Sequence, residues 1–318
     1  MIEEMISKFN NQSGENAFIR VDDKHILDLY IGFDKSANYS ILLVSDVEPI
    51  KLTSSLIIDV EVFQRKDLRW TTVVSLKQVQ YLDLFYQVSY DLIESSRSFL
   101  SEVTAQSFFF ERYKKWQNLL KRNRKGLLGP QEIKGLIGEL FFLKMFMLNS
   151  FDLKESIESW TGPEKTKQDF ILQDTWFEVK SITSSAGQVR ISSISQLDTT
   201  KDGYLATVKL DKTSSLDIEK ITLNSLYEEI LQMLENDQIK LEFENKLFEF
   251  GYINRKEYDY ETYRFMGIEF FRVNQNFPKL LREKLPSEIV EATYEISLSG
   301  IENFRVQKSI KKLGDLWN

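Results

Sequence analysis

The chain has 318 residues, of which 42% are hydrophobic and 28% are charged, and its formal net charge is −7. This composition is typical of a globular protein and excludes a disordered or fibrous chain, while the acidic excess gives no overall attraction for nucleic-acid phosphates. Cysteine is absent and His25 is the single histidine, which excludes disulfides, thiolate nucleophiles and multi-histidine metal sites. Any catalysis must therefore use carboxylates, lysine, hydroxyl groups or a metal ion held by oxygen ligands.

The first predicted region, residues 1–80, is rich in β-strands. Between residues 18 and 80 apolar and polar residues alternate and β-branched residues are frequent, which is typical of antiparallel strands joined by polar turns. His25 lies in one such stretch, and we interpret it as an ordinary strand residue. The chain starts with polar residues and contains no run of eighteen apolar residues, so we expect a cytoplasmic protein without a membrane span or secretion signal.

A helical linker is predicted over residues 81–125, because apolar residues recur there at helical spacing. Residues 112–134 form a basic segment with eight lysines and arginines against one glutamate. Such a segment is suited to contact the phosphates of a nucleic acid, and the alternative is an ordinary solvated helix. The candidate phosphate contacts are Lys121, Arg122, Arg124 and Lys125.

The third predicted region, residues 126–318, alternates between helices and strands. Gly126, Gly129 and Pro130 end the preceding helix, and Pro130 suits the first turn of the next one. After that helix we expect a polar loop over residues 155–167, then strands at 170–172, 176–179, 188–193 and 203–210, with a short helix at 193–198. Two helices, at about 217–235 and 238–250, and two final strands complete the region. This order predicts an α/β (α+β) fold with a mixed sheet flanked by helices.

Three ionisable residues gather in the hairpin predicted from "QDFILQDTWFEVKS", with its turn at Gln173 and Asp174. Glu178 and Lys180 lie two residues apart in a strand and therefore share a face, and symmetric pairing places Asp169 across from Glu178. Two opposed carboxylates destabilise a sheet, so a cation between them explains the arrangement best. The alternative for Lys180 is a structural ion pair with one of these carboxylates.

Glu139 is a fourth candidate, because its helix is apolar nearly all round and a buried carboxylate requires a partner. The alternative is an exposed helical pair with Lys144. Asp169 and Glu178 supply hard oxygen ligands that suit Mg²⁺, and the main-chain carbonyl of Val179 is a further candidate ligand. Trp160 and Trp176 are interpreted as packing residues.

The stretches "GLIGELFFL", "QDFIL", "FEVKS" and "VRISSISQL" together resemble the PD-(D/E)XK nuclease superfamily, in particular restriction-endonuclease-like proteins and an uncharacterised family associated with restriction-modification loci. The resemblance covers about residues 130–210. The matching positions are Glu139, Asp169, Glu178, Lys180 and Gln196. Gln168 stands where the pattern has proline, and we discount this difference because that position carries no ligand.

The resemblance implies a restriction-endonuclease-like fold and an Mg²⁺-dependent endonuclease, with Mn²⁺ able to substitute for Mg²⁺. Asp169, Glu178, Val179 and Glu139 would hold the metal. Lys180 would hold or activate the attacking water, and Gln196 and Ser192 would reach the scissile phosphate or orient Lys180. Arg190 is either a phosphate contact or an exposed strand residue.

As partners the resemblance implies double-stranded DNA, a second copy of the chain in a homodimer, and a methyltransferase or ATPase of the same restriction-modification or defence system. Two alternatives stay open. The chain is a nuclease of repair, of recombination or of RNA, or it is a non-catalytic DNA-binding subunit of a multi-protein defence complex.

Overall fold

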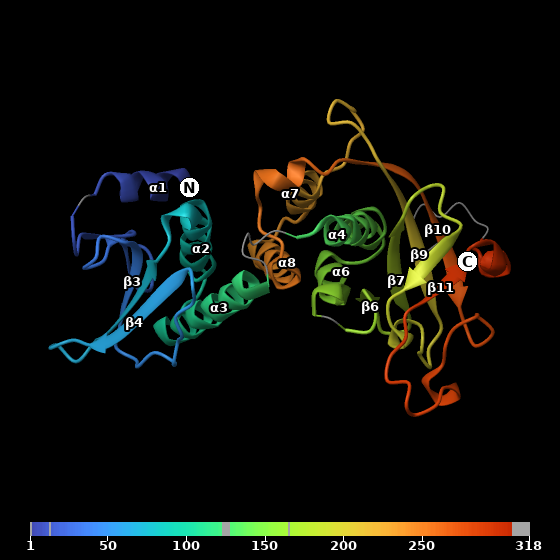
Figure 1. Ribbon diagram of the computed structural model, residues 1–318, viewed down its shortest axis with the longest axis horizontal. Coiled ribbons are helices and arrows are strands. Elements are labelled where there is room, and N and C mark those ends of the chain that lie inside the picture. The colour runs from blue at the N-terminus through green and yellow to red at the C-terminus, as the bar shows by residue number, and fades with distance from the viewer. Residues whose placement is uncertain (1, 13, 123–127, 165, 307–318) are drawn as a thin grey trace. The chain divides into compact units, whose positions relative to one another are not determined.

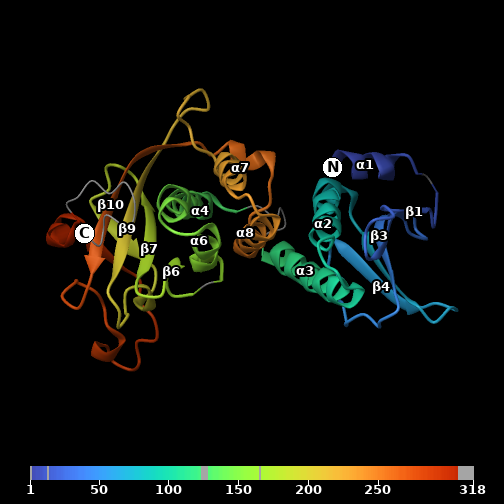
Figure 2. The ribbon, with the colours of Figure 1, turned by 180° about the vertical axis from the view of Figure 1, so that it is seen from behind.

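The computed structural model describes residues 2–12, 14–122, 128–164 and 166–306, and for residues 119–122 only the backbone (Figures 1 and 2). The chain divides into two compact units, Met1–Gly126 and Leu127–Asn318. Each unit buries its own set of large apolar side chains, among them Phe109 and Trp116 in the first and Phe142 and Trp160 in the second. No helix in the described part of the chain is both long enough and apolar enough to cross a membrane.

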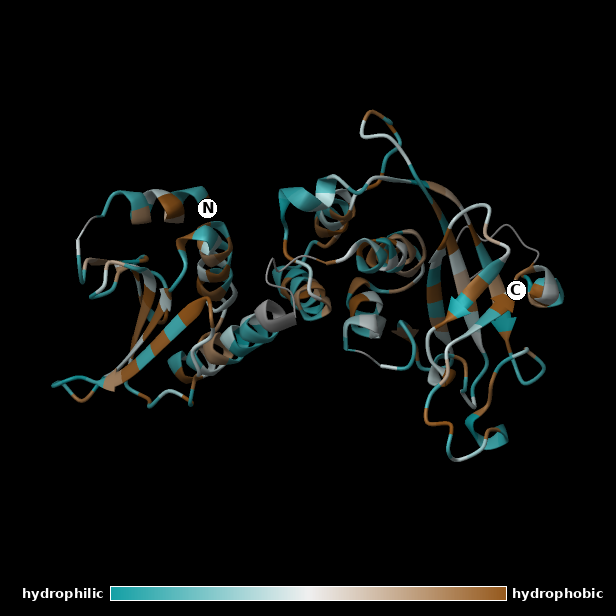
Figure 3. Ribbon diagram, in the orientation of Figure 1, coloured by the Kyte–Doolittle hydropathy of each residue, from teal (hydrophilic) through white to brown (hydrophobic). Residues whose placement is uncertain are grey.

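The first unit is built, within its described residues, from one antiparallel sheet and three helices. The strands occur in the order β1-β2-β3-β5-β4. Their bounds are Phe18–Arg20 (β1), Asp28–Phe33 (β2), Tyr39–Ser45 (β3), Ile58–Gln64 (β4) and Trp70–Leu76 (β5). Hydrophobic and hydrophilic residues alternate along β4 (Figure 3). The predicted β-rich N-terminal region is thus confirmed.

The helices of the first unit are α1 (Ile2–Asn10), α2 (Leu82–Ser95) and α3 (Glu102–Arg122). α2 and α3 lie within residues 81–125, where we expected a helical linker between two domains. Both helices belong to the compact first unit. His25 lies before β2 and not in a strand, so that part of the prediction was wrong. Its buried ring accepts a hydrogen bond from the Leu27 N–H at Nδ1, 3.0 Å, which leaves Nε2 to donate to the Ile93 carbonyl, 2.8 Å.

The second unit contains, among its described residues, a four-stranded sheet in the order β10-β9-β7-β6. The strands are β6 (Phe170–Ile171), β7 (Trp176–Ile182), β9 (Gly203–Lys212) and β10 (Tyr263–Val273). β7 and β9 are parallel and the other pairs are antiparallel, so the sheet is mixed as predicted. The strand after β7, β8 (Gln188–Ile191), instead pairs with β11 (Tyr294–Ser297) in a separate ribbon.

The helices of the second unit are α4 (Pro130–Phe142), α5 (Leu148–Ser150), α6 (Leu153–Ser159), α7 (Leu223–Met233) and α8 (Asp237–Phe250). α6 lies where we expected a polar loop. That prediction was wrong because Asp152 caps the helix, its side chain accepting the main-chain N–H groups of Lys154 and Glu155, while Ile157 is fully buried. Together the helices and the mixed sheet give the restriction-endonuclease-like α/β fold that the sequence predicted.

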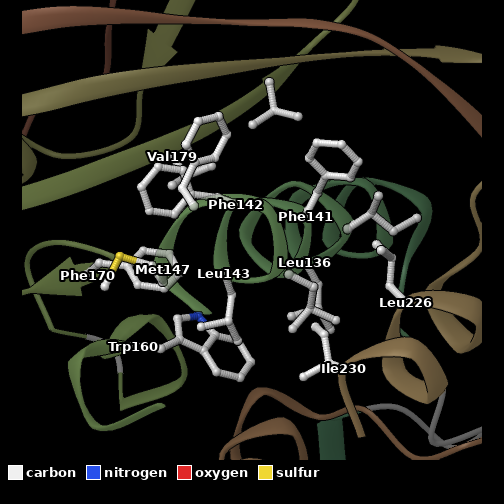
Figure 4. Packing of buried hydrophobic residues seen from close by; sticks show 14 of the residues in the cluster. Leu136, Phe141, Phe142, Leu143, Met147, Trp160, Phe170, Val179, Leu226 and Ile230 are labelled. Atoms are coloured by element: carbon white, nitrogen blue, oxygen red, sulfur yellow. The ribbon is translucent and has the colours of Figure 1, made fainter. Parts of the chain in front are cut away.

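α4 lies in the middle of the larger core, as Figure 4 shows for Leu136, Phe141 and Phe142, which project from several sides of the helix, and for Leu143 in the π-helical turn that follows it. Phe177 and Val179 belong to this core, and their neighbours in sequence point to the other face of the sheet. α4 approaches β7 very closely, because a Cβ atom added at Gly138 would overlap the Ser181 Oγ. This contact brings the next residue of the helix, Glu139, to the edge of the sheet.

Candidate active site

The hairpin of β6 and β7 has the symmetric register that the sequence predicts. Phe170 pairs with Phe177 and Ile171 with Trp176, and the N–H of Leu172 donates to the carbonyl of Thr175, 2.9 Å, to close the turn. The same register continued by one residue places Asp169 beside Glu178. Because β6 is a two-residue edge strand, the sheet ends at this point and leaves room for a side chain from α4.

Asp169 is held from both sides. Its Oδ2 accepts the N–H of Val179, 2.8 Å, and its main-chain carbonyl accepts the N–H groups of Thr161 and Gly162, 2.8 and 3.0 Å. The hairpin and the segment that follows α6 therefore fix the position of this carboxylate.

Glu178 and Lys180 form the ion pair that we considered as an alternative, with 2.7 Å between Glu178 Oε1 and Lys180 Nζ. Glu178 is 0% exposed, and its Oε2 has no hydrogen-bond partner in the described part of the chain. Lys180 Nζ also donates to Gln196 Oε1, 3.1 Å. Among the residues that the structure describes, the ion pair thus leaves one oxygen of a completely buried carboxylate without a partner, which is costly unless a further cation or proton is present.

Glu139 is buried, 8% exposed, and its Oε2 accepts the indole N–H of Trp160, 2.8 Å. The alternative of an exposed pair with Lys144 is wrong, because Lys144 pairs with Glu229. A Cβ atom added at Gly162 would lie 2.5 Å from Glu139 Oε2 and 3.4 Å from Asp169 Oδ1. Both carboxylates therefore border the same small space, which only glycine leaves open.

Burial is the main influence on the charges of these groups. Burial and then the negative charge of Asp169 raise the pKa of Glu178 to about 8 and that of Glu139 well above its ordinary value. Burial also raises the pKa of Asp169, against the positive charge of Lys180. For Lys180 burial acts to lower the pKa, but the charges of Glu178 and Asp169 outweigh it and the pKa is raised. Three carboxyl groups share one lysine, so the site attracts additional positive charge.

The donor set fits a hard divalent cation that keeps several of its own waters. Asp169, Glu178 and the Val179 carbonyl offer oxygen ligands, and Glu178 Oε2 has no competing partner in the described residues. No group of three or more His, Cys, Asp or Glu side chains within the described ranges is arranged to hold a metal ion. Glu139, whose Oε2 is bonded to Trp160, is accordingly not assembled with the other two carboxylates into a closed set of ligands.

Gln196 is brought to the site as expected, although the short helix after β8 is only a 3₁₀ turn, Ile194–Gln196. Its Oε1 accepts both Lys180 Nζ, 3.1 Å, and the main-chain N–H of Ser192, 2.8 Å. Ser192 and Arg190 are exposed, and no contact described in the structure joins Arg190 to the site. Of the predicted phosphate contacts, Arg124 and Lys125 lie outside the described residues, as do the side chains of Lys121 and Arg122.

Sequence reasoning missed several residues that support the site. Trp160 packs in the core as expected, but its indole N–H also bonds Glu139. Lys246 of α8 is buried and its Nζ donates to the Trp160 carbonyl and to Glu164 Oε1, both 2.7 Å. Gln168, which we discounted, donates from Nε2 to the carbonyls of Ser195 and Gln196. Only Gln168 gave a signal in the sequence, as the departure from the expected proline.

The candidate site therefore consists of five residues: Glu139, Asp169, Glu178, Lys180 and Gln196. No curated protein and no solved structure matches the chain. One family model matches residues 3–299, almost the whole sequence. The chain belongs to this family, DUF4420, whose description reads "Putative PD-(D/E)XK family member".

Proposed function

We propose that this protein is a metal-dependent endonuclease that hydrolyses phosphodiester bonds of DNA. The observation that carries the proposal is the completely buried Glu178. Among the described residues one of its carboxylate oxygens has no partner, while a lysine is adjacent and a second carboxylate, Asp169, lies across the hairpin. Membership of the PD-(D/E)XK family points to the same chemistry. Hydrolysis of a phosphodiester also needs no cysteine or second histidine, which the chain lacks.

Asp169, Glu178 and the Val179 carbonyl would hold Mg²⁺ or Mn²⁺, with Glu139 as a further ligand or as the partner of a metal-bound water. When bound, the ion neutralises charge on the phosphate and makes water a better nucleophile. Lys180 holds the attacking water and stabilises negative charge that develops on the phosphate. Gln196 keeps the Lys180 ammonium group in place, which its 3.1 Å hydrogen bond supports.

We propose double-stranded DNA as the substrate and a restriction or related defence system, in the cytoplasm, as the setting. Under this proposal Lys121, Arg122, Arg124 and Lys125 contact the DNA backbone, and Arg190 and Ser192 contact phosphates near the site. A homodimer would cut both strands, because each chain carries one such site. A methyltransferase or ATPase of the same system would be a partner.

A second candidate is a DNA-binding subunit without catalytic activity. It is favoured by the Glu178–Lys180 ion pair and by the absence of a three-ligand metal cluster in the described residues. A nuclease of RNA, repair or recombination would use the same groups and differs only in its substrate.

Cleavage of supercoiled plasmid with Mg²⁺ tests the proposal. We expect wild-type protein to cut the plasmid, and the double variant Asp169→Ala, Lys180→Ala to lose at least about 100-fold in rate, as enzymes do when transition-state stabilisation is removed. The matched control is Asp174→Ala, which removes an exposed carboxylate from the turn of the same hairpin and leaves cleavage unchanged.

Cleavage that persists in the double variant would refute the assigned site. Salt-dependent DNA binding by wild-type protein without any cleavage would favour the non-catalytic subunit. Parallel reactions with single-stranded RNA distinguish the remaining substrate class.

A further inference from the structure

Gln168 directly precedes Asp169 and is 6% exposed. Its side-chain Nε2 donates to two main-chain carbonyls, those of Ser195 and Gln196, at 3.1 Å each. An amide NH₂ group has two hydrogens, so these two bonds use its full donor capacity. A buried amide whose two N–H groups are both bonded holds the backbone at Gln168 and the backbone at Ser195 and Gln196 at a fixed separation.

The other end of Gln168 is also fixed. Its main-chain carbonyl accepts the hydroxyl groups of Thr161, 3.0 Å, and Thr166, 2.8 Å. The residue therefore connects the segment before β6 to the 3₁₀ turn Ile194–Gln196, about thirty residues away along the chain.

The 3₁₀ turn carries the side chain that contacts the lysine of the site. Gln196 Oε1 accepts Lys180 Nζ, 3.1 Å, and the N–H of Ser192, 2.8 Å. The carbonyl of the same residue accepts Gln168 Nε2. Gln196 thus links Gln168 to the Lys180 ammonium group, with one hydrogen bond at its main-chain carbonyl and the other at its side-chain oxygen.

We propose that Gln168 is a positioning residue for Lys180, which it places by clamping the turn that bears Gln196. The catalytic consequence rests on the proposed nuclease function, whereas the clamp itself does not. Proline at this position would offer no side-chain donor, and the two carbonyls would lose their partner.

The first test is the kinetics of Gln168→Met, which keeps the length of the side chain and removes both donors. We expect kcat for DNA cleavage to fall about 10-fold or more, because small misplacements of a catalytic group are costly. KM and the Mg²⁺ concentration at half-maximal rate stay unchanged, since no DNA or metal contact is altered. The matched control is Gln173→Met in the exposed hairpin turn, with wild-type kinetics.

The second test asks whether Gln168 acts through Gln196. On the background of Gln196→Ala, Gln168→Met is expected to cause no further loss of kcat, because the contact that it supports is already gone. Independent losses that multiply in the double variant would overturn the proposal. Wild-type kcat in the Gln168→Met single variant would overturn it as well.

Hydrogen exchange tests the clamp without any cleavage assay. The Ser192 N–H is bonded to Gln196 Oε1, whereas the Val179 N–H is bonded to Asp169 Oδ2. We expect Gln168→Met to speed hydrogen exchange at the Ser192 N–H and to leave exchange at the Val179 N–H unchanged. Equal exchange rates at Ser192 in wild type and Gln168→Met would overturn the proposed clamp. If Gln168→Met fails to fold, Gln168→Asn replaces it, since its shorter side chain cannot span both carbonyls.

Absence of cleavage by wild-type protein would refute the proposed nuclease function. Hydrogen exchange at the Ser192 N–H would then be the test of whether Gln168 clamps the turn.

Discussion

Glu178 illustrates how strongly one buried residue depends on its surroundings. It is 0% exposed, its Oε1 lies 2.7 Å from Lys180 Nζ, and the negative charge of Asp169 is close by. The cost of burying this charge explains why its pKa is raised to about 8. A divalent cation would remove that cost, and a proton does so in its absence.

This residue predicts how stability depends on pH without metal. The unfolded chain releases the Glu178 proton near the ordinary pKa of 4.5, whereas the folded chain holds it to about 8. The folded state binds more protons between these values, so the contribution of Glu178 to the free energy of unfolding is fully present below pH 4.5 and is lost as the pH rises through 8. We therefore expect the thermal midpoint in EDTA to fall between about pH 4.5 and 8.

Glu178→Gln is the variant that checks this expectation, because an amide does not titrate. Its thermal midpoint in EDTA should fall less than that of wild type over the same pH range, and Mg²⁺ should stabilise wild type but not the variant. Identical pH profiles for the two proteins would show that Glu178 is not the group responsible.

At the scale of elements, the contact between α4 and β7 decides where Glu139 lies. Gly138 touches Ser181 so closely that a Cβ atom would overlap its Oγ, whereas nothing lies within 4 Å of a Cβ atom added at Gly135 of the same helix. The close approach of α4 to β7 therefore requires glycine at position 138 but not at position 135.

We expect Gly138→Ala to displace the Ser181 side chain or α4 itself and to lower the free energy of unfolding by about 1–3 kcal/mol, as overpacking does. Gly135→Ala is the matched control and should raise it by about 0.5–1 kcal/mol, because alanine is the better helix former. Chemical denaturation measures both. Ser181→Ala should restore part of the loss in Gly138→Ala, and two alanine variants of equal stability would contradict the close contact.

At the scale of the whole molecule, the chain consists of two compact units, and every residue of the candidate site belongs to the second. The hydrophobic core around α4 and the one that contains Ile191 and Phe271 are both formed by residues of that unit. The division of roles that we expected, with a nuclease domain from residue 126 onward, stays a prediction.

A fragment of residues 128–318 tests this division. We expect it to unfold cooperatively, because it keeps its cores, and to retain Mg²⁺-dependent cleavage, because it keeps Asp169, Glu178 and Lys180. Circular dichroism during heating and the plasmid assay measure the two properties. A fragment that folds but does not cut would place a required group in residues 1–127.

Features that depend on short-range rules could be predicted from the amino-acid sequence. The two-residue turn and the alternation of a strand fixed the register of the hairpin, and with it the proximity of Asp169, Glu178 and Lys180. Helical periodicity likewise placed Glu139 in a buried helix. The order of these elements predicted the mixed sheet, and the spacing of Glu139, Asp169, Glu178, Lys180 and Gln196 carried the resemblance to the PD-(D/E)XK family.

Contacts between segments that are distant in sequence became visible only in the folded protein. The bonds of Trp160 to Glu139, of Gln168 to Gln196 and of Lys246 to the Trp160 carbonyl span 21 to 86 residues. No local pattern encodes such pairs, because a polar side chain finds its partner only when packing brings the segments together. The same packing removes water from the carboxylates, and this desolvation is what raises their pKa values.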